Sequence, residues 1–374
     1  MKHKTIIFLV CGMTLLFLSS CWDQRLLREH SLALSIGYDQ GENGGILKTI
    51  TYPSHSSGSD QAEAQKNSKV LTTEGNTVKD AEKKMDQQIP ERFDRSNARA
   101  ILFGKELAEE GIFSSLDSVY RDLRGPLNAK VAIFDGEAKE ALSVNTDESF
   151  LTGDLYAELL DSAEKAGITW NKNVQTACPI LLADGKDLVL PYLSINENKE
   201  VRVEGLALFH EDQMTGTLDT KETTMFLILS DQVTKNSALN LKVTDDKEEH
   251  VKNFANVAIR HNKQSIKVHV EESNIQVAVN VQLNVEIDEF ASDNLQNDKK
   301  MRTLETQIEK ALSELAEKTL QRMQEANNDS LGVGERLRAY HHDTWESINW
   351  EDMYPTIDIS STFKVDIVRH GIIN

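Results

Sequence analysis

The amino-acid sequence predicts an α+β protein of several domains, in which helices pack on mixed or antiparallel sheets. Three patterns carry this prediction. Apolar residues alternate with polar ones from Val277 to Ile287, which is typical of a strand with one buried face. Apolar residues recur at helical spacing from Met301 to Met323, which predicts a long amphipathic helix in the C-terminal domain. Strand-like and helix-like runs alternate in the first half of the chain.

The first twenty residues have the pattern of an export signal. Two lysines precede an uncharged run of 13 residues, from Ile6 to Leu18. A transmembrane helix needs about 20 apolar residues, so this run is too short to span a bilayer and fits a signal peptide. Cys21 directly follows Leu-Ser-Ser, which resembles a bacterial lipobox. We therefore expect residues 1–20 to be removed and Cys21 to carry a lipid anchor; the alternative is an ordinary secretion signal with an incidental cysteine.

Composition limits the classes of partner and of site. The 374-residue chain has a formal net charge of −19, and phosphate backbones and anionic lipid surfaces repel such a body. We therefore expect no nucleic-acid partner. Of the three cysteines, Cys11 leaves with the signal and Cys21 takes the lipid, so Cys178 has no disulfide partner. We expect Cys178 to be a small buried apolar residue and not a reactive thiol.

Residues 21–195 are expected to form an N-terminal α/β-type domain, as one unit or as two subdomains. The first two strands should form a hairpin around a glycine-rich turn. A helix should follow from Val78 and end before Pro90, and another should be capped by Ser114 or Ser115. The expected strands are residues 32–39, 46–52, 100–104 and 130–134, and a further helix-like stretch covers residues 137–142.

Residues 200–374 are expected to form a C-terminal α+β domain. The polar run 196–199 is the expected linker between the two domains. The strand at 277–287 should pair with residues 266–270, and residues 357–367 repeat the same alternation, so an antiparallel sheet is expected. The amphipathic helix between these strands should pack on that sheet, since helices cover one sheet face in this class of fold.

The sequence contains no motif that indicates catalysis or a cofactor. Phosphate-loop, dinucleotide, zinc-protease and serine-hydrolase signatures are all missing, which disfavours an envelope hydrolase. His341, His342 and Asp343 are adjacent and so do not face one another on a helix, which argues against a metal site. Trp345 and Trp350 are interpreted as core residues or as anchors of an interface.

Four blocks of the sequence resemble one family. The blocks are Cys21-Trp22-Asp23; residues 74–78 with 96–99; residues 204–209 with 216–218; and residues 329–334 followed by Trp345 and Trp350. Each block alone is weak, but their order and spacing extend over almost the whole chain. Together they resemble the Ger(x)C family of spore germination lipoproteins, the C subunits of nutrient germinant receptors.

This resemblance implies a non-enzymatic subunit with a multidomain α+β fold. It implies a diacylglyceryl or acyl lipid such as palmitate on Cys21, and a place on the outer face of the spore inner membrane. The implied partners are two integral membrane subunits of the receptor, of A and B type. Asn97 and Arg99 either contact a subunit or belong to a turn that fixes the next strand. The family pattern supplies no catalytic residue and no metal ligand.

A solute-binding lipoprotein that captures a small ligand directly is the competing hypothesis. Proteins of that class are usually built from two lobes of parallel sheet with helical crossovers. The strongest patterns in this chain are amphipathic strands of antiparallel type. The receptor-subunit hypothesis is therefore preferred, and anchoring beside membrane partners would let weak contacts suffice through high effective concentration.

Overall fold

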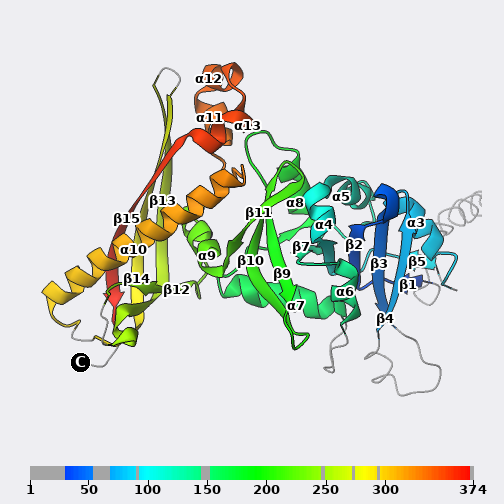
Figure 1. Cartoon of the computed structure of the whole chain (residues 1–374), viewed down its shortest axis with the longest axis horizontal. Helices are drawn as coiled ribbons and strands as arrows, with labels where there is room; N and C mark the ends of the chain where they lie inside the picture. The colour runs from blue at the N-terminus through cyan, green and yellow to red at the C-terminus, as the bar shows by residue number, and fades with distance from the viewer. Residues whose placement is uncertain are drawn as a thin grey trace, which may run out of the picture.

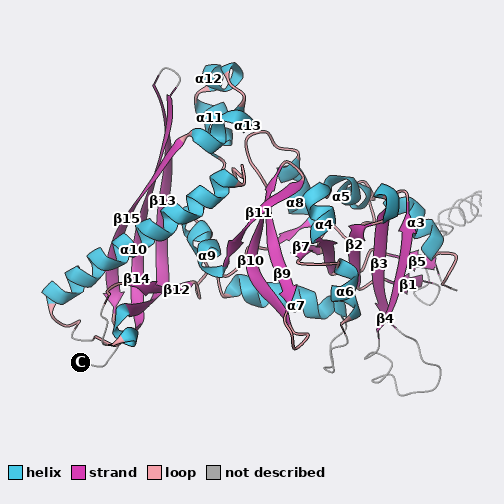
Figure 2. Cartoon of the chain, in the orientation of Figure 1, coloured by secondary structure: helices cyan, strands magenta, loops and turns pink. Residues whose placement is uncertain are grey.

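The computed structural model describes residues 30–53, 68–89, 92–144, 152–245, 249–271, 274–292 and 295–370. Within these ranges it contains a nine-stranded sheet, a four-stranded sheet and a two-stranded pair (Figures 1 and 2). The α+β prediction is confirmed, because both larger sheets carry packed helices. Cys21 and the expected signal peptide lie outside the described residues. None of the helices that the structure describes is long and apolar enough to cross a bilayer.

The nine-stranded sheet has the order β11-β10-β9-β7-β6-β2-β3-β4, with β8 paired to β7. Its middle strands β2, β6, β7 and β9 are parallel neighbours, and both flanks are antiparallel. The predicted hairpin of the first two strands is confirmed by the pairing of β2 with β3. The strands are β2 Ser35–Gln40, β3 Ile46–Pro53, β4 Ser68–Gly75, β6 Ala100–Gly104, β7 Lys130–Phe134, β8 Lys172–Asn173, β9 Val189–Ile195, β10 Val201–His210 and β11 Gln213–Asp219; the separate pair is β1 His30–Leu32 with β5 Arg92–Asp94.

Helices cover both faces of this sheet because its parallel strands are apolar on both sides. One face packs on α3 Val78–Met85, α4 Lys105–Glu110, α5 Phe113–Tyr120 and α8 Val174–Leu181. The other face packs on α6 Ala138–Ser143 and α7 Thr152–Lys165. The predicted serine cap of α5 is wrong. The helix begins at Phe113, whose backbone N donates to the Asp212 carboxylate at 3.1 Å, so the cap comes from the β10–β11 turn.

The expected linker at residues 196–199 is the turn of a hairpin. Its flanking strands β9 and β10 pair antiparallel, with Ile195 opposite Val201, and both belong to the nine-stranded sheet. The polar composition that suggests a linker also suits a tight surface turn. This finding corrects the linker prediction, because the sheet continues through the expected boundary instead of ending there.

The second sheet is built from long strands in the order β12-β13-β14-β15. The antiparallel pairing of β13 with β14 is confirmed, but β15 runs parallel to β14, so the purely antiparallel expectation is wrong. Parallel neighbours need a crossover connection, and the long helix α10 with the short helices after it supplies one. The elements are β12 Ala238–Lys242, β13 Phe254–Glu271, β14 Asn274–Phe290, β15 Asp358–Arg369, α10 Asp298–Glu325, α11 Val333–Tyr340, α12 His342–Ser347 and α13 Trp350–Met353; three short 3-10 turns are Glu42–Gly44, His250–Asn253 and Tyr354–Thr356.

One apolar core joins the two sheets. It contains Leu206 and Leu208 of β10, the helix α9 Thr220–Leu229, the inner face of β14 and the buried stripe of α10. In Figure 1, α9 lies between the two sheets and α10 runs across the four-stranded sheet. Fully buried Glu222 of α9 pairs with Lys318 and Arg322 of α10, both at 2.9 Å. The predicted packing of the long helix on the sheet is therefore confirmed.

Candidate functional site

The loop between α10 and α11, residues 326–332, ties the C-terminal helices to the nine-stranded sheet; we call it the seam loop. Asn328 is fully buried, and its side-chain amide donates to the carbonyl oxygens of Leu188 and Phe209, at 3.0 and 2.6 Å. Thr215 of β11 donates to the carbonyl of Ala326 at 2.6 Å. The Asn328 bonds engage carbonyl groups next to β9 and within β10, and the Thr215 bond satisfies a carbonyl at the C-terminal end of α10, where carbonyl groups lack partners within the helix.

Asp329 organises the seam loop. Its carboxylate accepts hydrogen bonds from the backbone N of Val333 at 2.8 Å and of Gly334 at 2.7 Å. It also accepts one from the indole Nε1 of Trp350 at 3.2 Å. The first two bonds cap the N-terminus of α11, whose first N–H groups have no acceptor within the helix. The third bond connects that cap to α13, so one side chain positions two helices.

Two glycines allow the close contact between the seam and the sheet. The backbone N of Glu335 donates to the carbonyl of Gly185 at 2.8 Å. A Cβ atom on Gly185 would lie 2.7 Å from the carbonyl carbon of Gly334, and one on Gly334 would lie 2.5 Å from Trp350 Nε1. Gly185 also has a φ of +77°, in the region that glycine populates at no steric cost. Larger side chains at these two positions would push α11 away from the sheet.

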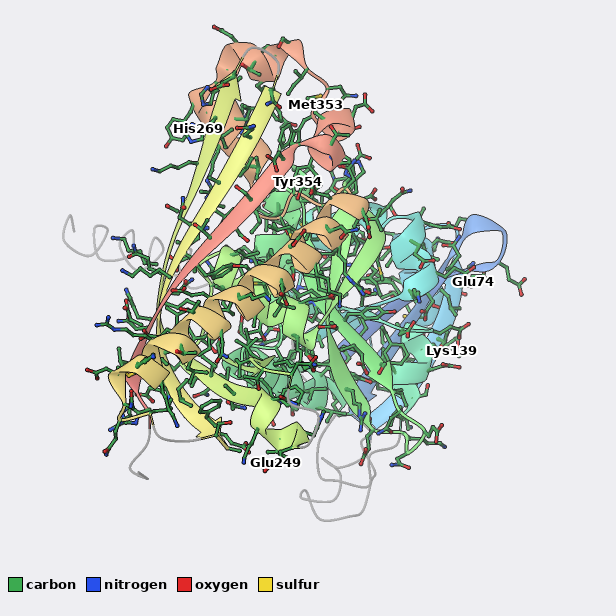
Figure 3. All side chains as sticks on the ribbon, turned by 60° about the vertical axis from the view of Figure 1, so that its left-hand side comes forward. Glu74, Lys139, Glu249, His269, Met353 and Tyr354 are labelled. Carbon is green, nitrogen blue, oxygen red and sulfur yellow. The ribbon has the colours of Figure 1, made fainter. Side chains whose placement is uncertain are left out.

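Three aromatic rings form a ladder beside the seam loop. The ring centroids of Trp345 and Trp350 are 5.9 Å apart, and those of Trp350 and Tyr354 are 5.7 Å apart. Tyr354 is buried, and its hydroxyl donates to the carbonyl of Asn328 at 2.9 Å. Figure 3 labels Tyr354 where the chain passes from α13 into β15. Both tryptophans are half-buried, so part of each ring faces outward.

The three aromatic side chains line a cavity of about 760 Å³, which we call the seam cavity. Its other walls are the loop before β9, the β10–β11 turn and the seam loop. Its volume lies within the range typical of small-molecule sites. Seven carboxylate side chains line it, against two basic ones, Lys186 and His210.

Burial alters the protonation of the carboxylates under this cavity. Burial raises the pKa of Asp329 to about 8, although the hydrogen bonds from Gly334 and Val333 oppose the shift. Burial also raises the pKa of Asp187, against the hydrogen bond from the backbone of Asp329. The Nδ1 atom of His210 lies 3.9 Å from Asp187 and has no hydrogen-bond partner among the described residues. The floor of the cavity therefore holds two buried acids, Asp187 and Asp329, whose pKa values are raised.

Comparison of the chain with known protein families identifies its family. A model described as the spore germination protein N-terminal domain matches residues 23–195, and one described as spore germination B3/GerAC-like, C-terminal, matches residues 204–371. The chain belongs to the GerAC-like family of spore germination proteins. The second match contains the whole seam loop and the aromatic ladder.

Relatives from bacilli correspond to this family member over nearly their full lengths. Spore germination protein GerQC of Bacillus cereus is 22% identical over 99% of this chain and 99% of its own. Spore germination protein KC of Bacillus subtilis (strain 168) is 22% identical over 100% and 98% of the two chains. The crystal structure of the GerBC protein superposes with a TM-score of 0.56, at 15% identity, over 92% of this chain and 100% of that one. The GerBC structure therefore shares the fold of this GerAC-like protein.

The structure separates the residues that sequence reasoning proposed as partner contacts. Trp345 and Trp350 lie together at the seam cavity. Asn97 is exposed at the start of β6, and Arg99 pairs there with Asp154 of α7. The end of α8 lines the seam cavity, whereas α7, which Arg99 contacts, lies on the opposite face of the sheet. The two pairs therefore do not form one site.

A buried charged network was not predicted. Lys48 of β3 is fully buried and pairs with Glu82 of α3 at 2.6 Å. Arg95 also pairs with Glu82, at 2.7 Å, and with Asp122 at 2.7 Å. Burial lowers the pKa of Lys48 to about 8, against the attraction of Glu82. A signal for Lys48 was present, because it follows Ile46 and precedes Ile50 in the two-residue register of an apolar strand face.

In the described part of the chain, Cys178 is not an activated thiol and the acidic and histidine side chains form no metal-binding group. Cys178 is buried, and burial raises the pKa of its thiol to about 11, which keeps it protonated and unreactive at neutral pH. Among the described residues, no group of histidine, cysteine and acidic side chains is arranged to hold a metal ion. The chemistry that the seam cavity offers is binding, through carboxylates and aromatic faces.

Proposed function

We propose that this protein is the lipid-anchored C-type subunit of a nutrient germinant receptor. Cys21 carries the lipid and holds the folded body on the outer face of the spore inner membrane. There the body associates with the A- and B-type integral membrane subunits and takes part in germination without catalysing a reaction. Two acyl chains suffice for this anchoring, since each buried methylene contributes about 0.8 kcal/mol.

The position of Cys21 relative to the family matches carries this proposal. The first match begins at residue 23, two residues after the cysteine of the lipobox-like pattern. The region ahead of it has the charge and apolar run of an export signal. The two matches then fill most of the remaining chain. The family match thus begins directly after the residue that we propose to carry the lipid.

The anchor is tested by replacing Cys21 with alanine in the full chain, as the sole copy in a sporulating strain. We expect the Cys21→Ala protein to leave the spore membrane fraction, and nutrient-triggered germination to fall. Cys178→Ala is the matched control, because it removes the other cysteine of the mature chain and leaves the anchor intact. Full membrane retention of Cys21→Ala with unchanged germination would refute the proposal.

Association with membrane subunits is tested by site-specific photo-crosslinking in spore membranes. Asn97 and Trp345 are suitable positions, because they represent the two separate groups proposed as contacts. We expect at least one position to give a crosslink to an integral membrane protein of the receptor. A crosslink from Asn97 would favour the β6 and α7 surface, which includes Arg99. A crosslink from Trp345 would favour the seam surface with Trp350, and membranes that yield neither product would exclude both.

A further inference from the structure

We propose that the seam cavity binds a small organic cation, a ligand with an ammonium group on an apolar body. This inference does not depend on the proposed receptor role, because it concerns a property of the isolated chain. It rests on the unbalanced charge of the cavity, on its aromatic wall and on its volume. The charge disfavours anions, the aromatic wall favours an organic cation over a bare metal ion, and the volume suits a small molecule.

The charge of the seam cavity favours a cation. Three of its carboxylates, Glu211, Glu346 and Glu351, have exposed side chains and no ion pair among the described residues. Of the two basic residues that line the cavity, Lys186 already pairs with Glu335 at 3.4 Å. A concave surface lined by one sign of charge focuses the field and attracts the opposite charge. The lining therefore disfavours anionic ligands such as phosphates or dicarboxylates.

The aromatic wall favours an ammonium group over a bare metal ion. Trp345 and Trp350 both line the cavity, and their rings pack against each other with centroids 5.9 Å apart. The Trp350 ring is fixed by its bond to Asp329, so it does not have to be ordered by the ligand. Cations are attracted to the face of an indole ring, and quaternary ammonium groups are a well-known ligand of such walls. The remaining apolar surface of the rings suits an alkyl body.

Carboxylates deeper in the cavity are already engaged and would not bind the ligand. Asp212 accepts a hydrogen bond from the backbone N of Phe113. Asp187 accepts one from the backbone N of Asp329, and Asp329 accepts one from the backbone N of Val333. The ligand charge should therefore sit between the tryptophan faces and the rim carboxylates Glu346 and Glu351. Glu346 belongs to α12 and Glu351 to α13, so ligand binding would couple these two short helices.

The test is calorimetric titration of the full chain in detergent with choline and with its neutral carbon isostere, dimethylbutanol. The two probes have the same shape and differ in charge. We expect choline to bind saturably, with an affinity at least about tenfold above that of the neutral probe. Trp345→Leu should weaken choline binding about tenfold, and the Glu346→Gln, Glu351→Gln double variant should weaken it by a similar factor.

Matched variants distinguish a site from a general charge effect. Glu317→Gln removes an exposed glutamate of α10 that does not line the cavity, and it should leave choline binding unchanged. Trp350 is left intact, because its replacement would disturb the Asp329 cap. Equal responses to choline and dimethylbutanol would overturn the proposal. An equal loss in Glu317→Gln and in the double variant would overturn it as well, since the attraction would then come from net charge alone.

Discussion

Asp187 and Asp329 hold each other through two hydrogen bonds across the seam. The backbone N of Asp329 donates to Oδ2 of Asp187 at 2.7 Å, and the backbone N of Asp187 donates to the carbonyl oxygen of Asp329 at 3.3 Å. Asp187 precedes β9 and Asp329 follows α10, so residues 142 positions apart are joined directly. The contact leaves the Asp329 carboxylate free to cap α11 and to bind Trp350.

Replacing Asp329 with alanine should strongly destabilise the protein. Three buried donors, the N atoms of Val333 and Gly334 and Nε1 of Trp350, would lose their acceptor. Each unsatisfied buried group costs about 1–3 kcal/mol, so we expect a loss of about 3 kcal/mol in the free energy of unfolding, measured by denaturant titration. Asp366→Ala, which removes an exposed aspartate of β15, should change it by less than about 0.5 kcal/mol. Similar values for both variants would contradict the assigned role.

Stability should fall as pH rises toward 8, because of Asp329. Burial raises its pKa to about 8 in the folded state, from the ordinary value of 3.8. Between these values the folded chain keeps a proton that the unfolded chain has released, so raising the pH favours unfolding. From about pH 6 to 8 we expect a loss of about 2 kcal/mol attributable to this group. Asp39, with a pKa near 6, contributes mainly below this window.

The pH effect is assigned by comparing the wild type with Asp329→Asn in the same buffers. The amide does not titrate, so the variant should show a flatter profile between pH 6 and 8. Parallel profiles for the two proteins would show that other groups cause the dependence.

Gly185→Ala should displace α11 from the sheet. Its new Cβ would meet the backbone of Gly334 at 2.7 Å, in addition to the strain of a φ of +77°. Gly44→Ala is a matched control, because Gly44 has a φ of +80° and nothing within 4 Å of a Cβ. Both variants should lose about 1 kcal/mol from the backbone term, and Gly185→Ala should lose about 1–3 kcal/mol more from overpacking. Equal melting temperatures for the two variants would show that the contact is not tight.

Glu82→Gln should destabilise the N-terminal part of the nine-stranded sheet. It would leave the buried cations of Lys48 and Arg95 without their shared carboxylate, and breaking a buried pair typically costs about 3–5 kcal/mol. Lys79→Met is the control, because Lys79 pairs with the same carboxylate at 2.9 Å but is exposed, and such pairs contribute at most about 1 kcal/mol. Chemical denaturation of both variants should show this difference; a small effect of Glu82→Gln would mean that Lys48 is neutral when buried.

Local patterns were sufficient to predict the central strands of both larger sheets and the long helix. The alternation from Val277 to Ile287 and the stripe from Met301 to Met323 correspond to β14 and α10. Both patterns depend only on which face of an element is buried, and that information is local. The direction of β15 was not predictable in this way, because a parallel and an antiparallel neighbour bury the same alternate residues.

The seam could be predicted only in part. Trp345 and Trp350 were identified as core or interface residues, and the structure places them at the cavity. The role of Asp187 was not predictable, because an aspartate is common in the loop before a strand. Its role arises from a partner 142 positions away, and no local pattern encodes such a distance. The same applies to Asp212, which caps α5 from another turn.

The β9–β10 hairpin has a consequence for how this protein can be cut. A protease that cleaved at residues 196–199 would not release two independently folded domains. If the two pieces separated, β9 and β10 would become unpaired sheet edges, and unpaired edges pair with strands of other chains. The two pieces would remain associated through the sheet and the shared core, or they would aggregate after separation. A chimaera that joins one half of this protein to the other half of a relative should fold only when β9 and β10 come from the same parent.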